Sequence, residues 1–441
     1  MEQRRKNLTQ LFIPICLETL LYMLSGMVDT LMLSSVNDQA VGAVGTANTY
    51  IGIFIIMFSV ISSGMVAVMT QNIGAGRPGV AYQARQLGLA FNAVLGVIMS
   101  LFLSLGAGTI LSGVGVADAL MQPAKTYLQI VGGFCILNAL IPICSSYLRA
   151  FGFSKEPLYA SIIGNVINFC LNAFFLFVLH KGVAGVATAT VISRIINLVI
   201  VVLLGAVLVK AKQHPERESN RAVMGQIIRI GLPSACETAI YNVSMTLVIR
   251  FLNQMDAQGL NVTARSYTMQ ITNFSYCVGA ALAQANAIMT GWHIGAKEYD
   301  ACDRGTKKAA VIGAIVAVIL ETMFALCSGW IMQLFSKDPQ MVSLVGKLLA
   351  IDIVLEIGRV TNLVYGQALK TSGDAVFPVV MGACFMILCS VGGTYLFGIR
   401  LGLLAVGAYI GMTGDECVRA VGMYLRWKSG KWKEKGLVKS R

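Results

Sequence analysis

The sequence has 441 residues, of which 56% are hydrophobic and 12% charged, and its mean hydropathy is +0.71. Soluble domains usually carry about 25% charged residues, so this composition excludes a water-soluble enzyme. The formal net charge is +13, but the basic residues lie between apolar segments and do not form one basic face, which argues against a nucleic-acid partner. Walker, HExxH and G-x-S-x-G motifs do not occur, so we expect neither an enzyme nor an ATP-driven pump.

Twelve apolar runs, bounded by charges or by Gly and Pro clusters, are candidate membrane-spanning helices. They begin near residues 8, 43, 82, 121, 157, 183, 223, 262, 305, 341, 375 and 402. The first run follows the basic segment MEQRRKN but has no small-residue cleavage site after it, so we expect a retained helix and not a signal peptide. The sequence therefore predicts an all-α polytopic membrane protein.

Basic residues alternate between the loops that connect these runs. One set of loops carries clusters such as Arg4, Arg5 and Lys6, whereas the other set carries single residues such as Lys181 and Lys337. By the positive-inside rule, both termini are expected in the cytoplasm and the chain in the inner (plasma) membrane of the cell. The tail RWKSGKWKEKGLVKSR either binds lipid headgroups or serves only to anchor this topology.

An internal duplication joins the two halves of the chain. IPICLETLLYMLS from Ile13 matches LPSACETAIYNVS from Leu232, which pairs Glu18 with Glu237. At nearly the same spacing along the chain, IGAG and LRAFGFSKEP in the first half match IGAK and LKTSGDAVFP in the second. Shared Pro, Glu, Gly and basic positions are not explained by apolar composition, so we infer a true repeat.

Each repeat is expected to contain six spans, so the two copies have the same orientation in the membrane. We predict an N-lobe over residues 1–211, a cytoplasmic linker over 212–222, a C-lobe over 223–426 and a basic cytoplasmic tail over 427–441. Two parallel lobes can open a site alternately to each side of the membrane, which is the mechanical requirement for a carrier.

Motifs along nearly the whole chain resemble the multidrug and toxic compound extrusion (MATE) family. They include Pro14 to Asp29 with the following TLMLSS and AVGAVGTAN, QNIGAG from Gln71, LRAFG from Leu148 and NVINFCLN from Asn165. GVATATVIS, GLPSACE and LKTSGD extend the match. The resemblance implies two pseudo-symmetric six-helix lobes that form a V, and antiport of organic, often cationic compounds against inward Na⁺ or H⁺.

The resemblance also implies a coupling site around Asp29, an ionisable residue within the first span. In the bacterial and archaeal branch, such an Asp is completed by Asn and Asp one turn apart on the fifth span and by Thr on the sixth. Asn168, Asn172 and Thr190 occupy these places, with Asn172 where the family has its second carboxylate. The oxygen ligands that remain suit H⁺ or a hard cation such as Na⁺, although Asp29 could instead hydrogen-bond only between helices.

Two further groups of ionisable residues are candidates. Glu18 and Glu237 each follow a Pro by four residues, and they either bind cationic substrate or protons or hold kinked helices to their neighbours. The third group lies on spans ten and twelve, as a structural ion-pair network or a path for the coupling ion. Its members are Glu356, Arg359, Asn362, Asp415, Glu416 and Arg419.

The sequence thus predicts a secondary active efflux transporter that uses no cofactor and no metal beyond a coupling Na⁺. We expect its partners to be a small organic substrate and the lipid bilayer, and the protein to be a monomer. The alternative is a flippase of lipid or polysaccharide precursors with related architecture. A flippase predicts a cleft lined with Arg and Lys for pyrophosphate, and few basic residues lie deep in the N-lobe spans.

Overall fold

The structure is a computed structural model that describes residues 6–35, 38–113, 116, 118–210, 214–256, 259–333 and 335–438. These residues form helices and short connections, with no β-strand among them, which confirms the predicted all-α class. The basic residues Arg4 and Arg5, the first two residues of the predicted linker 212–222, and the last three of the predicted tail lie outside the described residues.

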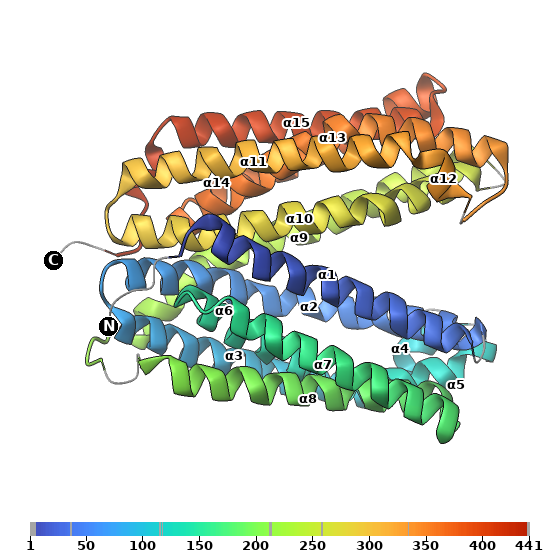
Figure 1. The fold of residues 1–441 in the computed structure, drawn as a ribbon. Coiled ribbons are helices and arrows are strands. Elements are labelled where there is room, and N and C mark those ends of the chain that lie inside the picture. Colours follow the sequence, from blue (N-terminus) through green and yellow to red (C-terminus); the bar gives the residue numbers. More distant parts are fainter. Residues whose placement is uncertain are drawn as a thin grey trace. The chain divides into compact units, whose positions relative to one another are not determined.

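The chain divides into two compact units, an N-terminal unit over Met1–Gly231 and a C-terminal unit over Leu232–Arg441. The described residues of the N-terminal unit form six long helical segments, whose helices are labelled in Figure 1. They are α1 (Leu8–Ser34), α2 (Asp38–Gly74), α3 (Pro78–Leu105), α5 (Asp118–Tyr127) continued by η1 (Leu128–Gly132) and α6 (Ile136–Ala150), α7 (Lys155–Ala173) continued by η2 (Phe174–Val178), and α8 (Gly182–Leu208). A short helix, α4 (Ala107–Gly113), follows α3.

The next six long segments begin with α9 (Asn220–Met255), which starts in the N-terminal unit and continues into the C-terminal unit. They continue with α10 (Leu260–Gly295), α11 (Tyr299–Leu326), α13 (Pro339–Ser372), α14 (Val376–Phe385) with η4 (Met386–Val391) and η5 (Thr394–Arg400), and α15 (Leu404–Lys428). The short elements α12 (Ser328–Met332) and η6 (Lys431–Glu434) complete the chain.

Every predicted span corresponds to one of these segments. The largest difference in starting position is at the ninth span, predicted near residue 305 and beginning at Tyr299. Among the described residues, seven helices are long and apolar enough to cross a membrane, and the bent pair Leu120–Gly132 and Ile136–Ala150 supplies an eighth. The other four segments, α9, α10, α13 and α15, are less apolar and carry more polar or charged residues.

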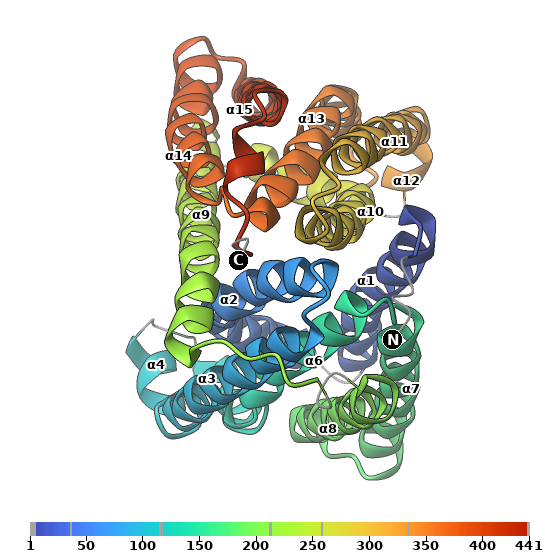
Figure 2. The same ribbon diagram turned by 90° about the vertical axis from the view of Figure 1, so that its left-hand side faces the viewer.

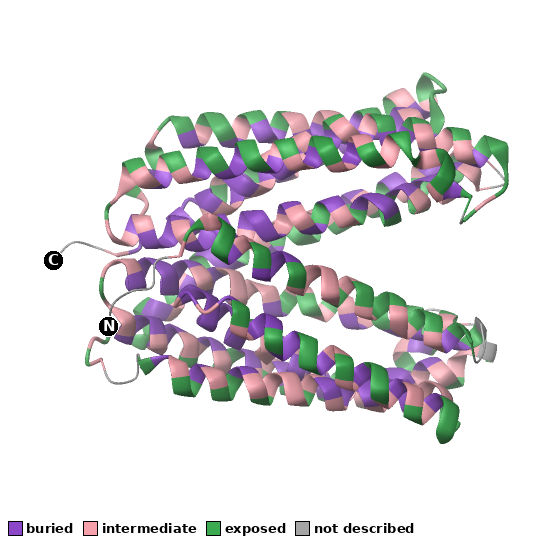
Figure 3. Ribbon diagram, in the orientation of Figure 1, coloured by how far each residue is buried: buried purple, intermediate pink, exposed green. Residues whose placement is uncertain are grey.

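Each unit is a bundle in which helices distant in sequence pack together. In the N-terminal unit, α1 packs against α7, and α3 against both α2 and α6. In the C-terminal unit, α13 packs against α10, α11 and α15, as Figure 2 shows. Buried and exposed positions alternate along most helices (Figure 3), as expected when one face meets the bundle and the other faces lipid.

The first turns of α9 pack closely on α2, which explains why the units divide within α9 and not in the preceding loop. A Cβ atom added to Gly231 would lie 1.7 Å from the carbonyl oxygen of Val60, and one added to Gly64 would lie 2.0 Å from that of Ile227. Only glycine allows the two backbones this approach. The start of α9 is therefore held to the N-terminal unit.

The predicted basic tail packs on the C-terminal unit over its described residues. The rings of Trp427 and Trp432 stack with centroids 4.1 Å apart, and both side chains are 1% exposed. Trp427 Nε1 donates to Asp303 Oδ1 at 2.9 Å, and Arg426 Nε lies 2.7 Å from Asp374 Oδ2. The aromatic residues of the tail therefore stabilise this unit, which the sequence alone did not indicate.

Candidate transport site

The predicted coupling residues on α1 and α7 meet in the N-terminal unit. Asn172 Nδ2 donates to Asp29 Oδ1 at 2.6 Å and lies 3.2 Å from Asn168 Oδ1, one turn earlier on α7. Asn172 is fully buried and Asn168 is 5% exposed. The amide of Asn172 therefore links Asp29 to the fifth span, which places a carboxylate and two amides in one polar cluster.

The same cluster has one polar atom available to a ligand and one nearby cation. Asn172 Oδ1 is buried and has no hydrogen-bond partner among the described residues. Arg194 on α8 lies within electrostatic reach of Asp29. Thr190 is on the same helix, but its hydroxyl donates to the carbonyl oxygen of Val186 at 2.9 Å and not to Asp29. The structure thus brings together three of the four predicted coupling residues.

Glu18 and Glu237 each form an ion pair inside their own unit. Glu18 Oε2 lies 2.6 Å from Arg149 Nη2 on the last turn of α6, and Glu237 Oε2 lies 2.6 Å from Lys370 Nζ near the end of α13. The four side chains are 10% to 17% exposed. Each acid therefore joins the first helix of a repeat to its fourth.

The prolines that precede these acids open the helix for such contacts. Pro14 has no N–H, so the carbonyl oxygen of Gln10 loses its partner within α1. The buried hydroxyl of Ser154, between α6 and α7, donates to this oxygen at 3.0 Å. The start of α1 is therefore fixed to the end of the fourth span by a hydrogen bond and by the Glu18 ion pair.

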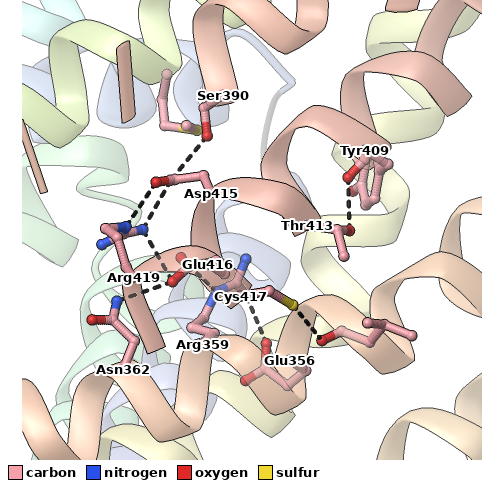
Figure 4. A network of polar contacts seen from close by, with 12 residues as sticks. Glu356, Arg359, Asn362, Ser390, Tyr409, Thr413, Asp415, Glu416, Cys417 and Arg419 are labelled. Carbon is pink, nitrogen blue, oxygen red and sulfur yellow. Dashed lines mark hydrogen bonds and ion pairs between the residues drawn. The ribbon is translucent and has the colours of Figure 1, made fainter. Parts of the chain in front are cut away.

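The six predicted network residues form one connected cluster between α13 and α15 (Figure 4). Arg359 Nη1 donates to Glu356 Oε2 at 2.7 Å, and its Nε lies 3.5 Å from Glu416 Oε1. Arg419 donates to both oxygens of Asp415 at 2.8 and 3.0 Å, and its Nη2 lies 3.0 Å from Glu416 Oε2. Each guanidinium thus contacts two carboxylates.

Polar residues outside the charged pairs complete this cluster. Asn362 Nδ2 donates to Glu416 Oε2 at 3.0 Å, and Ser390 Oγ on η4 donates to Asp415 Oδ2 at 3.0 Å. The π-helical turn η4 packs closely on α15. A Cβ atom added to Gly411 of α15 would lie only 2.8 Å from the carbonyl oxygen of Cys389 on η4. The glycine therefore allows the Ser390 hydroxyl to reach the α15 carboxylate.

A cavity of about 210 Å³ lies within the C-terminal unit and borders this network. Helices α9, α10, α13 and α15 and the π-helical turn η4 line it. The lining combines ionisable groups with large apolar and aromatic side chains. It consists of Tyr241, Met245, Arg265, Met269, Thr272, Asn273, Tyr276, Asp352, Arg359, Ser390, Tyr409, Met412, Asp415 and Glu416.

The sequence reasoning missed three charged residues that the structure places at these sites. Glu321 on α11 is fully buried, and its charge is within reach of those of Asp352 and Glu356. A single acid inside the apolar run AVILETMF is a detectable signal, as is Arg194 inside the sixth span. Arg265 gave no such signal because it lies near the predicted start of a span, where an interfacial residue is expected.

Comparison with known proteins agrees with this architecture. The MatE family model matches residues 14–174 and 233–396, which correspond to the two repeats. Uncharacterized transporter YisQ of Bacillus subtilis is 33% identical over 431 residues, covering 96% of this chain and 94% of that protein. Probable multidrug resistance protein NorM of Thermotoga maritima is 23% identical, covering 98% of this chain and 94% of that protein.

Solved structures show the same fold. A crystal structure of MATE in the straight conformation has a TM-score of 0.88 at 19% identity and covers 97% of this chain and 96% of its own. An outward-facing multidrug resistance MATE family transporter has a TM-score of 0.86 at 18% identity, with 98% and 96% covered. The fold and its matches define a polytopic helical transporter. The chain belongs to the MATE family, whose members are transporters and not enzymes.

Proposed function

We propose that the chain is a secondary active efflux transporter that exports small organic compounds in exchange for inward-moving H⁺ or Na⁺. The observation that carries the proposal is the part-buried hydrogen bond from Asn172 on α7 to Asp29 on α1, which joins a carboxylate of one span to the amides of another. The names of the relatives that are multidrug resistance proteins support the export of organic compounds. We also propose that the two six-helix units alternate access to the substrate.

A cation at Asp29 would couple the ion gradient to export. A carboxylate at membrane depth costs at least about 2.5 kcal/mol, and a bound H⁺ or Na⁺ lowers this cost by neutralising it. Inward movement of one charge across the membrane releases about 2.3 kcal/mol per 100 mV. The free Oδ1 of Asn172 supports a second oxygen ligand for Na⁺, whereas H⁺ would need Asp29 alone.

Buried acids in the C-terminal unit support cationic, amphipathic substrates. The cavity, its network and the neighbouring Glu321 together contribute five carboxyl groups, on Glu321, Asp352, Glu356, Asp415 and Glu416. They contain three guanidinium groups, on Arg265, Arg359 and Arg419, so the charge with all groups ionised is 3 − 5 = −2. A negative excess in a poorly hydrated site attracts cations.

The membrane placement of the chain completes the proposal. The basic loop clusters support cytoplasmic N- and C-termini in the plasma membrane. Each unit has its own candidate residues and needs none from another copy, which supports a working monomer. The lobe boundaries at residues 211 and 223 remain part of this proposal.

Proteoliposomes test the coupling. A fluorescent organic cation is loaded, and its efflux is followed under a Na⁺ gradient and, separately, under a pH gradient, for the wild type and for Asp29→Asn. We expect one gradient to drive wild-type efflux and Asp29→Asn to abolish that drive, because the amide keeps the bond from Asn172 but cannot carry the charge.

The matched control is Asp118→Asn, an exposed aspartate in the first turn of α5. This variant should retain wild-type coupling. Wild-type efflux that ignores both gradients would overturn the proposed antiport. Full coupling in Asp29→Asn would move the coupling site to the acids of the C-terminal unit.

A further inference from the structure

Arg265 on α10 is a buried cation that lines the C-terminal cavity without an acidic partner. Its side chain is 5% exposed, and no carboxylate in the described part of the chain forms an ion pair with it. Its Nε is buried with no hydrogen-bond partner, and its Nη2 has only a weak contact to Met245 Sδ at 3.7 Å. The guanidinium therefore keeps most of its five donors free.

Two other arginines of this unit, Arg359 and the buried Arg419, show how unusual that arrangement is. Arg359 and Arg419 each contact two carboxylates. A buried ion that lacks a partner is strongly unfavourable, because the interior does not replace the hydration that it has lost. A guanidinium left without an acid beside a cavity is stabilised when a ligand in that cavity supplies the anion.

The rest of the cavity wall suits a cationic group. Asp352 is 2% exposed, and its Oδ2 has no hydrogen-bond partner in the described structure. Tyr409 is within electrostatic reach of both Asp352 and Arg265, and Tyr241 and Tyr276 add aromatic faces that attract cations. One cavity thus offers an unpaired cation and an unpaired carboxylate oxygen.

We propose that this cavity binds a small zwitterion, with the ligand carboxylate on Arg265 and its ammonium group near Asp352 and the tyrosine rings. The volume of about 210 Å³ is below the roughly 300 to 1,000 Å³ of drug-sized sites, so the ligand, or the polar part that enters, is small. This inference rests on the proposed export function, because it assigns the cavity to the exported compound.

Binding to the full-length protein in lipid nanodiscs, without any ion gradient, tests the inference. The probes are γ-butyrobetaine and phenylalanine betaine, each compared with its methyl ester, which keeps the quaternary ammonium group and removes the negative charge. Calorimetry should show that the wild type binds each betaine about tenfold more tightly than its ester, because a hydrogen bond to a charged group contributes about that much.

Arg265→Gln should remove this preference without weakening ester binding, because loss of the guanidinium removes a positive charge that repels the ester's ammonium group. Arg265→Lys should keep part of the preference because the charge remains. Retained ester binding also shows that the variant is folded. The matched control is Arg250→Gln on α9, an exposed arginine outside the cavity, which should behave as the wild type.

Equal wild-type affinity for betaines and esters, no betaine binding, or a preference that survives Arg265→Gln would each overturn the inference. These results do not depend on coupling. A chain that binds betaines through Arg265 but shows no gradient-driven efflux would overturn the proposed function alone, and a chain that exports an organic cation but prefers esters would overturn only the zwitterion site.

Discussion

The carboxylate of Glu18 on α1 lies 2.6 Å from the guanidinium of Arg149 on α6, so the pair joins two helices that are far apart in the sequence. The second repeat reproduces the pair with Glu237 and Lys370, also at 2.6 Å. Both partners occupy matching places in the two repeats, so the duplication copied the whole ion pair. A contact retained in both copies after a change from Arg to Lys indicates that charge attraction matters more here than the exact geometry.

Removing one partner of this ion pair should lower the free energy of unfolding by more than the intact pair contributes to it. We expect Glu18→Gln and Arg149→Met each to lower the free energy of unfolding by about 2 kcal/mol, because each removes this ion-pair partner of a largely buried charge. The double variant should cost little more than either single variant. Chemical denaturation in mixed micelles measures all three, with Asp118→Asn as the exposed control.

The charge reversal Glu18→Arg with Arg149→Glu should recover part of the lost stability. If the two single effects simply add, the residues do not interact and the proposed link between the first and fourth helices is wrong. The same cycle on Glu237 and Lys370 should give the same sign.

Substitution of Arg419 on α15 should lower the free energy of unfolding more than substitution of any other basic residue of the network. Arg419→Met leaves Asp415 and Glu416 buried without their shared cation, so we expect a loss of about 3 to 5 kcal/mol in the free energy of unfolding. Arg304→Met, at an exposed position on α11, should change it by less than about 0.5 kcal/mol. Similar losses in the two variants would show that the network adds no stability.

Two glycines on α15 provide a matched test of close helix packing. A Cβ atom on Gly411 would lie 2.8 Å from the carbonyl oxygen of Cys389 and 2.9 Å from the backbone nitrogen of Thr394, whereas one on Gly414 meets nothing within 4 Å. Gly411→Ala should therefore cost about 1 to 3 kcal/mol. Gly414→Ala should be neutral or stabilise by up to about 1 kcal/mol. A larger loss of unfolding free energy in Gly414→Ala than in Gly411→Ala would contradict the packing of α15 on η4.

Asp256, between α9 and α10, should make the start of α10 sensitive to acid. Partial burial opposes its charge, but hydrogen bonds from the Asn261 backbone and side chain, Leu260 and Gly259 outweigh this and lower its pKa below the ordinary 3.8. A lowered pKa in the folded state means that the stabilisation is complete above about pH 4 and is lost as the pH falls through the folded-state value.

Hydrogen exchange at the amides of Leu260 and Asn261 measures this effect, since both donate to Asp256, at 2.8 and 3.0 Å. We expect Asp256→Asn to speed their exchange at neutral pH by an amount that corresponds to about 1 kcal/mol. In the wild type, protection should fall below pH 4 and be unaffected between pH 5 and 7. A variant with unchanged protection would show that Asp256 does not cap α10.

Much of the architecture followed from the sequence, because hydropathy and repetition are local properties of the chain. A helix that crosses a bilayer needs about 20 mainly apolar residues, so the spans could be placed within a few residues. The repeat made Glu18 and Glu237 equivalent, and the spacing of Glu356 and Arg359 put them on one helix face. Side-chain pairs within one helix can be predicted without knowing how that helix packs against its neighbours.

Contacts between helices required the tertiary structure. The rotation of each helix about its axis decides which basic residue pairs with Glu18 and which side chains surround Arg265. It also decides whether Asn172 or Thr190 reaches Asp29. Packing of many side chains sets that rotation, and close approaches such as those at Gly411 set the distances. The sequence by itself therefore determined a duplicated twelve-helix carrier of the MATE type, and only the folded bundle decided which of the described charges have an ionic partner.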